Sequence, residues 1–448
     1  MESLVSVPKL ILAPMVRVGT LPFRLLALRH GADLVYTEEI IDKKLMCTQR
    51  YENKDLNTID FVSQKDHSVV LRIREEEKES LVWQIGSNNP ETVLKAAKIV
   101  EQDVRSIDIN MGCPEHFSVH AGMGAGLLKT PDIAFNILQN LTKNMSIPVS
   151  CKTRLLPKYE DWVSFVAKMQ TTGIEHLTTH CRIREEMSRG HAHWSALKSI
   201  QSEPEINIPI FISGDWFSCQ DAMEIKKYTN TPAILIARGA CHNPAIFEQI
   251  KTYWENPDNI TNHDDSNPLY DEHKIPLSEW NLESLTQSNN DTQPIIEIKE
   301  GESKNKAKKR AKKLLKKLKE SKTDDNKADG KQSKILTKII ETRNGQCEVY
   351  NLCKEYLQIA IECGNKFGNT KYVLNYTLRT HKDDYETFVK VNYARNYQEM
   401  AKVFDCEEYL EEKLDAIPNL EQYLSDTYYG KMHKKSLNLK KQKITEDQ

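Results

Sequence analysis

The ten cysteines of this 448-residue chain include no Cys-x-x-Cys pair. That absence argues against zinc ribbons, iron–sulfur sites and thioredoxin-like redox centres, all of which need closely spaced thiols. The cysteines are also too scattered for the disulfide framework of a small secreted domain. The sequence therefore predicts no metal site, and it predicts free thiols in a reducing compartment.

Long apolar stretches are missing as well, because no run of about 18 apolar residues occurs in the sequence. The segment MESLVSVPKL at 1–10 lacks the apolar core of a signal peptide. We therefore expect a soluble cytoplasmic protein with no membrane partner. The chain also has no large excess of positive or negative charge, because 62 basic and 64 acidic residues give a formal net charge of -2. Any contact with nucleic acid must then come from local basic patches.

Within residues 9–250, short apolar and β-branched runs alternate with segments whose apolar residues recur every three or four positions. The first pattern is typical of buried strands and the second of amphipathic helices. The eight predicted strands are LILAPM (10–15), LVYTEEI (34–40), LVWQIG (81–86), SIDINMG (106–112), VSCKTRL (149–155), HLTTHC (176–181), PIFISGD (209–215) and AILIARGA (233–240). Eight strand–helix units predict an α/β fold, a closed (β/α)8 TIM barrel. A doubly wound open sheet is the alternative, because a sequence pattern does not show whether the sheet closes.

Polar residues and glycines gather where these predicted strands end. In a TIM barrel the active site lies where the C-terminal ends of the strands meet the following loops. The residues at these ends are Met15, Glu38, Glu39, Gln84, Asn110, Cys113, Lys152, Arg154, His180, Arg182, Gly214, Asp215, Arg238 and Gly239. Taken singly, Lys152 is more simply a solvated lysine and His180 a hydrogen-bonded core histidine. Agreement among so many strand ends predicts one shared site.

The segment NMGCPEH at 110–116 is followed by GMGAG at 122–126. On its own, Cys113 is open to three interpretations: a structural thiol, a metal ligand or a reacting group. GMGAG is not a dinucleotide-binding fingerprint, because it follows a loop and not a strand. It is either a tight turn or a part of the site.

The last two predicted strands end in features that suit a phosphate group. Ser213 and Gly214 end the seventh strand, and Arg238 ends the eighth, where barrel enzymes often bind phosphate. Backbone amides at glycines approach an anion closely, and a helix expected to begin at 243–244 would favour negative charge. We therefore expect a phosphorylated cofactor.

Several stretches resemble the flavin-dependent tRNA-dihydrouridine synthases, and among them the eukaryotic branch that modifies uridine 20 of the tRNA D-loop. They are LILAPMVRVGTLPFRLLAL, SIDINMGCPEHFSVHAGMGAGLL, CKTRLLP, THCRIREE and ILIARGACHNPAIF. The resemblance resumes at 356–379, which is similar to the family's helical tRNA-binding domain. It implies an oxidoreductase that uses NADPH to reduce the 5,6 double bond of a uridine in tRNA to 5,6-dihydrouridine.

The resemblance also implies noncovalent FMN. Pro14, Met15 and Val16 would pass under its isoalloxazine ring, Gln84 would hydrogen-bond the pyrimidine edge, and Lys152 would place a cation near N1. The ribityl phosphate would lie near His180 and be bound by Ser213, Gly214, Asp215, Ala237 and Arg238. The chain departs from the family pattern at two positions, with Cys181 where glycine and Ser213 where asparagine is common.

Within that resemblance, the chemistry of uracil reduction gives Cys113 a role. Reduced flavin supplies hydride to carbon 6, and carbon 5 needs a proton from the opposite face of the base. A thiol, with an ordinary pKa of about 8.5, is still protonated near neutral pH and can act as this general acid. The expected contacts to the substrate are Glu39, Asn110, Arg154 and Arg182.

Composition divides the chain further. We expect the FMN-binding barrel at 1–252, a charged linker at 253–343, a helical tRNA-binding domain at 344–430 and a basic tail at 431–448. Within the linker, 304–322 holds eleven Lys or Arg residues against one Glu. Such a block is typical of disordered or solvated segments. This basic block could bind the tRNA backbone, or it could be a solvated linker with no further role. It could also be a nuclear localisation signal, in which case the protein would be found in the nucleus as well as in the cytoplasm.

Two other functions stay open at this point. One is a barrel flavoenzyme that acts on a free pyrimidine, as the similar dihydroorotate dehydrogenases do. The other is an RNA-binding relative that has lost its chemistry. The helical domain argues against the first alternative, and the intact Cys113, Lys152 and Arg238 argue against the second. We expect the protein to be a monomer.

Overall fold

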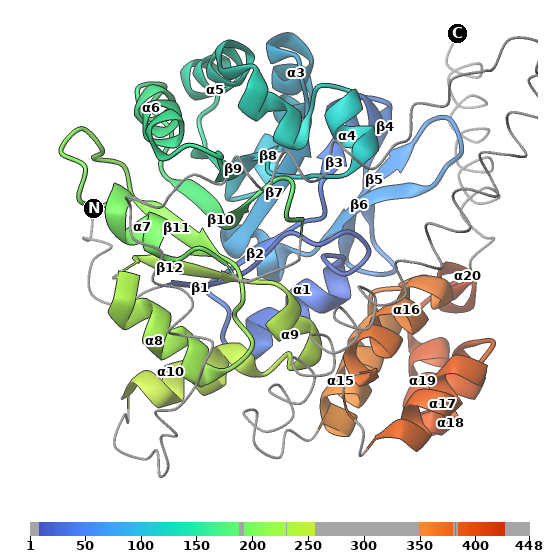
Figure 1. Ribbon diagram of the computed structural model, residues 1–448. Helices are drawn as coiled ribbons and strands as arrows, with labels where there is room; N and C mark the ends of the chain where they lie inside the picture. Colours follow the sequence, from blue (N-terminus) through green and yellow to red (C-terminus); the bar gives the residue numbers. More distant parts are fainter. Residues whose placement is uncertain are drawn as a thin grey trace, which may run out of the picture.

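The computed structural model describes residues 9–187, 192–229, 231–255, 349–379, 381 and 384–425. In these residues the chain forms a barrel followed by a helical domain (Figure 1). The linker predicted at 253–343 and the tail predicted at 431–448 lie outside the described residues, apart from 253–255 at the end of a barrel helix.

The first domain is a closed barrel of parallel strands. In the order of their hydrogen-bonded neighbours the strands are β2 (Leu34–Tyr36), β1 (Lys9–Leu12), β12 (Ala233–Ile236), β11 (Ile210–Ser213), β10 (Leu177–Ile183), β9 (Val149–Leu155), β8 (Ser106–Met111) and β7 (Leu81–Gly86). Val35 of β2 pairs with Leu81 of β7, which closes the ring. A short strand, β3 (Ile40–Ile41), also pairs with β7. The predicted barrel is therefore confirmed, and the open-sheet alternative was wrong.

Helices cover the outside of the barrel. They are α1 (Leu21–Arg29), α2 (Asp42–Met46), α3 (Pro90–Val100), α4 (His116–His120), α5 (Pro131–Asn144), α6 (Tyr159–Gln170), α7 (Ser195–Ile200), α8 (Cys219–Thr229), α9 (Arg238–His242) and α10 (Ile246–Glu255), with 3-10 turns η1 (Glu75–Ser80), η2 (Glu101–Asp103) and η3 (Gly124–Lys129). The start of α3 shows why such segments become helical. The Asn89 side chain accepts hydrogen bonds from two free backbone amides, and Pro90 occupies the first helical position. The helix then buries Val93 and Val100 against the sheet.

A second, antiparallel sheet, formed by the segment between β3 and β7 along the chain, was not predicted. It consists of β4 (Thr48–Asn53), β5 (Thr58–Ser63) and β6 (Val69–Ile73). A buried ion pair explains why the alternation of apolar and polar residues did not reveal it. Arg72 Nη2 lies 2.6 Å from Asp60 Oδ2, so a carboxylate occupies a buried strand position where the pattern calls for an apolar residue.

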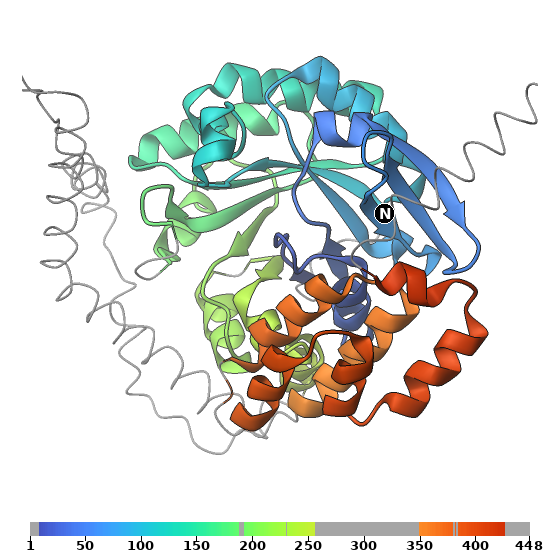
Figure 2. The ribbon, with the colours of Figure 1, turned by 90° about the vertical axis from the view of Figure 1, so that its right-hand side faces the viewer.

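The helical domain comprises α15 (Val349–Glu362), α16 (Phe367–Leu378), α17 (Tyr385–Tyr393), α18 (Tyr397–Val403), α19 (Glu407–Ala416) and α20 (Leu420–Leu424). Its helices lie together on one side of the barrel, where α15 packs against α1 and α16 against α9 (Figure 2). The unpredicted sheet contributes to this interface, because Arg72 Nη1 donates to the backbone oxygens of Cys363 at 2.7 Å and Gly364 at 3.0 Å. The two domains are thus joined by specific polar contacts.

His30 adds a pH-sensitive contact to this interface. Its Nδ1 lies 2.9 Å from Glu248 of α10, and its Nε2 lies 2.9 Å from Glu355 of α15. The hydrogen bond to Glu355 raises the pKa of His30, although burial opposes the rise and the bond to Glu248 supports it. A raised folded pKa means that the stabilisation is complete below the unfolded pKa of about 6.5 and is lost as pH rises through the folded value.

We expect the His30→Gln variant to lose roughly 0.5–1 kcal/mol at pH 6 and less at pH 9, because the wild type has itself lost the charged contact there. Urea denaturation of both proteins at several pH values measures the difference. A difference in stability that does not change between pH 6 and pH 9 would contradict the assignment.

Candidate active site

One cavity of about 360 Å³ opens at the C-terminal ends of the barrel strands. All but two of the residues that were given a role in the predicted site line it: Pro14, Val16, Glu39, Gln84, Asn110, Cys113, Lys152, Arg154, His180, Ser213, Gly214, Asp215, Ala237 and Arg238. Glu38 and Gly239, which were predicted only from their place at strand ends, do not line it. Met15 lies behind the lining, where it packs against the core and its sulfur lies 3.4 Å from that of Cys241. Arg182 is only 1% exposed and does not line the cavity either. The folded chain thus brings nearly all of these residues together, while their individual roles stay predictions.

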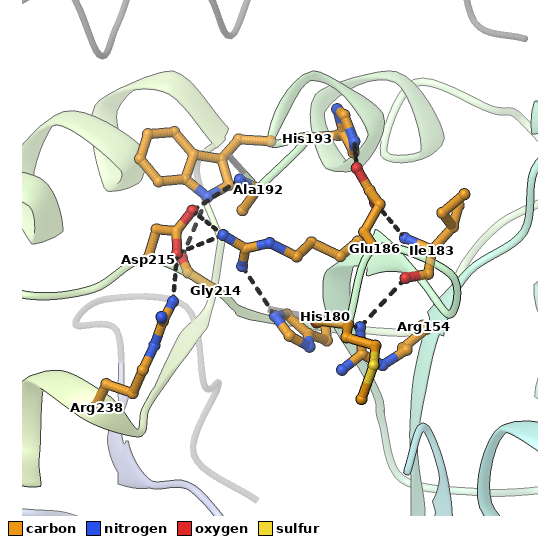
Figure 3. A network of polar contacts seen from close by, with 12 residues as sticks. Arg154, His180, Ile183, Glu186, Ala192, His193, Gly214, Asp215 and Arg238 are labelled. Carbon is orange, nitrogen blue, oxygen red and sulfur yellow. Dashed lines mark hydrogen bonds and ion pairs between the residues drawn. The ribbon is translucent and has the colours of Figure 1, made fainter. Parts of the chain in front are cut away.

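Asp215 forms the centre of a charged cluster beneath one end of the cavity (Figure 3). Its carboxylate accepts two hydrogen bonds from Arg182 Nη2, at 2.7 and 2.6 Å, and one from Arg238 Nη2, at 2.8 Å. The backbone amide of Ala192 donates a fourth, at 2.7 Å. Burial opposes ionisation of Asp215, but the two guanidinium groups outweigh it and lower the pKa of this carboxyl. Arg182 therefore holds Asp215 in place, and Arg238 is the arginine of this cluster that reaches the cavity.

Gly214, next to this cluster, has no room for a side chain. Its φ of +130° lies in the region that favours glycine, and a Cβ atom there would lie 3.0 Å from the Ala192 Cβ and 3.2 Å from the His180 Cδ2. Gly214 consequently adds no side chain to the cavity wall, and a ligand can approach the backbone there more closely than at a residue that has a Cβ atom. By contrast, Asn243 and Pro244 do not line the cavity. The helix that begins at the cavity is α9, at Arg238, so the expectation of a helix terminus at 243–244 in the site was wrong.

Lys152 and His180 face the middle of the cavity from neighbouring strands. Burial, together with the nearby Arg154, lowers the pKa of Lys152 to about 8. Among the described residues, no carboxylate forms an ion pair with the Lys152 ammonium group. Burial and the same cations lower the pKa of His180 far below its ordinary value, so this imidazole is neutral. The middle of the cavity therefore presents a lysine cation that has no partner in the described part of the chain.

At the other end of the cavity, Arg154 connects two loops. Its Nε donates to the backbone oxygen of Gly112 at 2.7 Å, and its Nη1 donates to that of Met187 at 2.9 Å. Burial, followed by repulsion from Arg182, lowers the pKa of Arg154 to about 10, which leaves it charged near neutral pH. Arg154 thus fixes the turn before Cys113 against the loop after β10.

The Cys113 thiol is partly exposed at this end and shares it with the Glu39 carboxyl group. Burial raises the pKa of Cys113 to about 11, and the negative charge of Glu39 contributes. Burial also raises the pKa of Glu39, whose buried Oε1 has no hydrogen-bond partner within the described chain. The thiol is accordingly protonated throughout the neutral range, as a general acid must be.

The glycines of GMGAG belong to the same end of the site. Gly124 has φ +54°, and a Cβ atom there would lie 2.8 Å from the Cys113 backbone oxygen and 2.9 Å from the Cys113 Cβ. That oxygen accepts a hydrogen bond from Ala125 N at 2.9 Å. Glycine is required here because the segment packs directly on Cys113. GMGAG is thus a turn that packs on Cys113, and none of residues 122–126 lines the cavity itself.

Some lining residues were not foreseen. Trp216 and Phe217 follow Gly214 and Asp215 directly, and the Arg238 guanidinium lies 4.8 Å from the centre of the Phe217 ring. Their position immediately after a strand end was the signal that could have identified them. Glu115 and Met187 also line the cavity, but they lie on loops whose path a sequence pattern does not give.

The helical domain places polar and aromatic residues against the loop that follows β1 and carries the cavity residue Val16. Asn369 Nδ2 of α16 donates to the backbone oxygen of Arg17 at 2.7 Å, and the Arg17 guanidinium lies 5.4 Å from the Tyr372 ring. Arg379 lies 3.7 Å from the ring of Tyr376.

The basic residues of the predicted tRNA-binding domain differ in their surroundings. Lys371 donates to the backbone oxygens of Asn392 and Ala394, so it holds α16 against the end of α17. His381 Nε2 lies 2.8 Å from the backbone oxygen of His242. Arg379 lies over the Tyr376 ring, whereas Lys382 lies outside the described residues.

The described residues contain neither a metal-binding cluster nor a membrane-spanning helix. No group of three or more His, Cys, Asp or Glu side chains in that part of the chain is arranged to hold a metal ion. Within the same residues, no helix has both the length and the apolar character needed to cross a bilayer.

Comparison with known families now adds to this geometry. The model of the dihydrouridine synthase (Dus) family matches residues 11–340, which is more than half of the chain. The chain belongs to the dihydrouridine synthase family. The match includes every barrel strand that carries the cavity, apart from the first two residues of β1.

Individual dihydrouridine synthases resemble the chain to different degrees. The tRNA-dihydrouridine(20) synthase [NAD(P)+] of Schizosaccharomyces pombe is 42% identical over 247 residues, 53% of this chain and 52% of that protein. The enzyme of the same name from Saccharomyces cerevisiae is 48% identical over 191 residues, 40% of this chain and 50% of that protein. The tRNA-dihydrouridine(20a/20b) synthase [NAD(P)+] of Schizosaccharomyces pombe is 30% identical over 243 residues. The matches to the two (20) synthases thus span about half the length of each of these relatives.

Proposed function

We propose that this protein reduces the 5,6 double bond of a uridine in tRNA to 5,6-dihydrouridine, with FMN as cofactor, NADPH as reductant and uridine 20 of the D-loop as target. The observation that carries the proposal is one cavity that holds the Cys113 thiol at one end and the Arg238 guanidinium beside Gly214 at the other. Family membership supports the reaction, and the activity named for two relatives supports position 20 and a nicotinamide reductant.

The residues of the cavity fit FMN. The bare backbone at Gly214 and the guanidinium of Arg238, whose side chain is 32% exposed, suit a phosphate group. Lys152, with no carboxylate partner among the described residues, suits a ring that gains negative charge on reduction. When bound, the flavin supplies the hydride for carbon 6 of the uracil.

The chain's own residues supply the rest of the chemistry. Cys113 donates its thiol proton to carbon 5, so one hydride and one proton saturate the double bond. The turn held by Arg154 and the segment around Gly124 fix the position of that thiol. A base in folded tRNA must first unstack, which costs a few kcal/mol. Contacts to Arg17, Tyr372 and Arg379 would offset that cost.

A direct test compares tRNA from cells with and without the protein by mapping dihydrouridine at each D-loop position. Loss of dihydrouridine at position 20 alone is expected. The proposal would be wrong if the dihydrouridine map of tRNA did not change and the purified protein formed no dihydrouridine from NADPH and tRNA.

For the cofactor, we expect the purified protein to be yellow and to release FMN, not FAD, on denaturation. Arg238→Ala should weaken FMN binding roughly 10- to 100-fold, since a charge-assisted hydrogen bond to phosphate is removed. Fluorescence titration of the flavin-free protein measures this. Lys65→Ala is the matched control, because it removes an exposed positive charge that does not line the cavity. Equal FMN affinities for the two variants would show that the phosphate lies elsewhere.

A further inference from the structure

A chain of hydrogen bonds connects a buried carboxylate to the backbone of Cys113. Gln84 Nε2 donates to Asp108 Oδ2 at 2.8 Å, and Asn110 Nδ2 donates to Gln84 Oε1 at 3.1 Å. Asn110 Oδ1 then accepts from the backbone amides of Gly112 and Cys113, each at 2.9 Å. Asp108 is 0% exposed, so none of its bonds competes with water. The chain of bonds runs from β8 to β7, back to β8 and into the turn that carries the thiol.

The direction of every bond in this chain follows from its first member. An ionised carboxylate only accepts hydrogen bonds, so the NH2 group of Gln84 must face Asp108. The Gln84 oxygen then faces Asn110 and requires the NH2 group of Asn110. That leaves the Asn110 oxygen for the two backbone amides, which are themselves donors only. A reversed Asn110 would place its NH2 group against these two N–H groups and break both bonds.

The second oxygen of Asp108 is also occupied. Ser150 Oγ on the neighbouring strand β9 donates to Asp108 Oδ1 at 2.8 Å. Each carboxylate oxygen therefore has its own hydrogen-bond donor. Burial raises the pKa of Asp108, and these two hydrogen bonds oppose that rise. Asp108 itself does not line the cavity.

We propose that Asp108 is a positioning residue for Cys113: through Gln84 and Asn110 it fixes the backbone turn at 112–113 and so the placement of the thiol. This inference rests on the proposed function for its catalytic meaning, because the turn matters to the reaction only if Cys113 is the proton donor. Asp108 acts without touching substrate or cofactor. It also explains the spacing of Asp108, Asn110 and Cys113 within SIDINMGC, where the aspartate had no assigned role.

The test is amide hydrogen exchange at Gly112 and Cys113 in the flavin-free protein. Asp108→Leu removes the acceptor, and Gln84→Leu breaks the next link. Both variants should exchange these two amides roughly fivefold to tenfold faster, which corresponds to the loss of one ordinary hydrogen bond. The amide of Ile234 in β12, on the other side of the barrel, should exchange as in the wild type. Using two variants keeps the test valid if one of them does not fold.

Two conservative variants serve as controls. Asp108→Asn should keep slow exchange, because its amide oxygen can still accept from Gln84 while the Ser150 hydroxyl accepts from its NH2 group. Ser150→Ala should keep slow exchange as well, because it leaves the Asp108–Gln84 bond intact. Unchanged exchange in both leucine variants would overturn the proposal. Exchange in Asp108→Asn as fast as in Asp108→Leu would overturn it too, because the negative charge and not the bond direction would then hold the turn.

The consequence for the reaction is measured separately. Single-turnover reduction of tRNA by Asp108→Leu should fall roughly 10- to 100-fold, as expected when a reacting group is misplaced by about 1 Å. Asp108→Asn should stay within a few-fold of the wild type. A wild-type rate in Asp108→Leu despite fast exchange would overturn the positioning role. If exchange changes as expected and even the wild type forms no dihydrouridine, the proposed function fails, while the control of the turn by Asp108 stands.

Discussion

Replacing Cys113 by alanine is expected to slow the reduction of tRNA by roughly 10²- to 10⁴-fold, the usual contribution of a positioned general acid. The variant should keep its flavin, and free enzyme should oxidise NADPH at the normal rate, because neither step needs a proton for the uracil. Cys113→Ser should be nearly as slow, because a hydroxyl group donates a proton far less readily than a thiol does.

The measurement is single-turnover reduction of tRNA by pre-reduced enzyme. Cys47→Ala is the matched control, since Cys47 is exposed and does not line the cavity, and it should react at the wild-type rate. A wild-type rate for Cys113→Ala would show that this thiol has a structural role and is not the proton donor.

The pH dependence of the same reaction gives a second check on Cys113. Its pKa is raised to about 11 by burial and by Glu39, so the thiol keeps its proton as pH rises from 7 to 9. The wild-type rate should therefore show no loss from ionisation of Cys113 in this interval. Glu39→Gln removes the neighbouring negative charge and lowers the pKa of the thiol, which should move the alkaline loss of activity to lower pH. A wild-type loss of activity near pH 8.5 that Glu39→Gln moves to lower pH would contradict this environment, whereas a loss that the variant leaves in place belongs to Lys152, whose pKa is about 8.

Replacing Asp215 by alanine is expected to cost about 3–5 kcal/mol of stability, the range found when one partner of a buried ion pair is removed. The reason is that Arg182, at 1% exposure, would keep its charge in the protein interior without its carboxylate. Arg238 would lose its only ion-pair partner among the described residues, so its guanidinium would no longer be held at the cavity. FMN binding should weaken together with stability.

Urea denaturation of the flavin-free protein measures the first effect without any contribution from the ligand. Asp132→Ala is the matched control, because Asp132 pairs with Lys168 while 86% exposed, and such surface pairs contribute less than about 1 kcal/mol. Asp215→Asn should lie between the two, since it keeps the acceptor oxygen and tolerates the φ of +58° at this position. Equal costs for Asp215→Ala and Asp132→Ala would mean that the buried cluster does not hold this end of the barrel together.

The sequence by itself was sufficient for the strand–helix alternation, and thereby for the class of fold. Strands such as β12, with the sequence AILI, are short apolar runs whose side chains are buried on both faces, and such runs are recognisable without any knowledge of their neighbours. It was also sufficient for most of the site. Parallel strands end at the same edge of a barrel, so residues as distant along the chain as Gln84 and Arg238 could be placed together before their contacts were known.

Only the tertiary structure decided the features that depend on strand register and on contacts between distant segments. Closure of the ring rests on the pairing of β2 with β7, and the sheet of β4, β5 and β6 contains a buried Asp60 that makes sense only with Arg72 beside it. The position of Arg182 beneath the site, instead of in its lining, follows from the carboxylate of Asp215 in the loop after the neighbouring strand β11. The hydrogen-bonded connection from Asp108 to Cys113 likewise depends on the register of β7 against β8. That register places the Gln84 amide between Asp108 and Asn110. Periodicity shows which residues are buried, but a hydrogen bond or an ion pair is made by two atoms a few ångströms apart, and the sequence does not contain that distance.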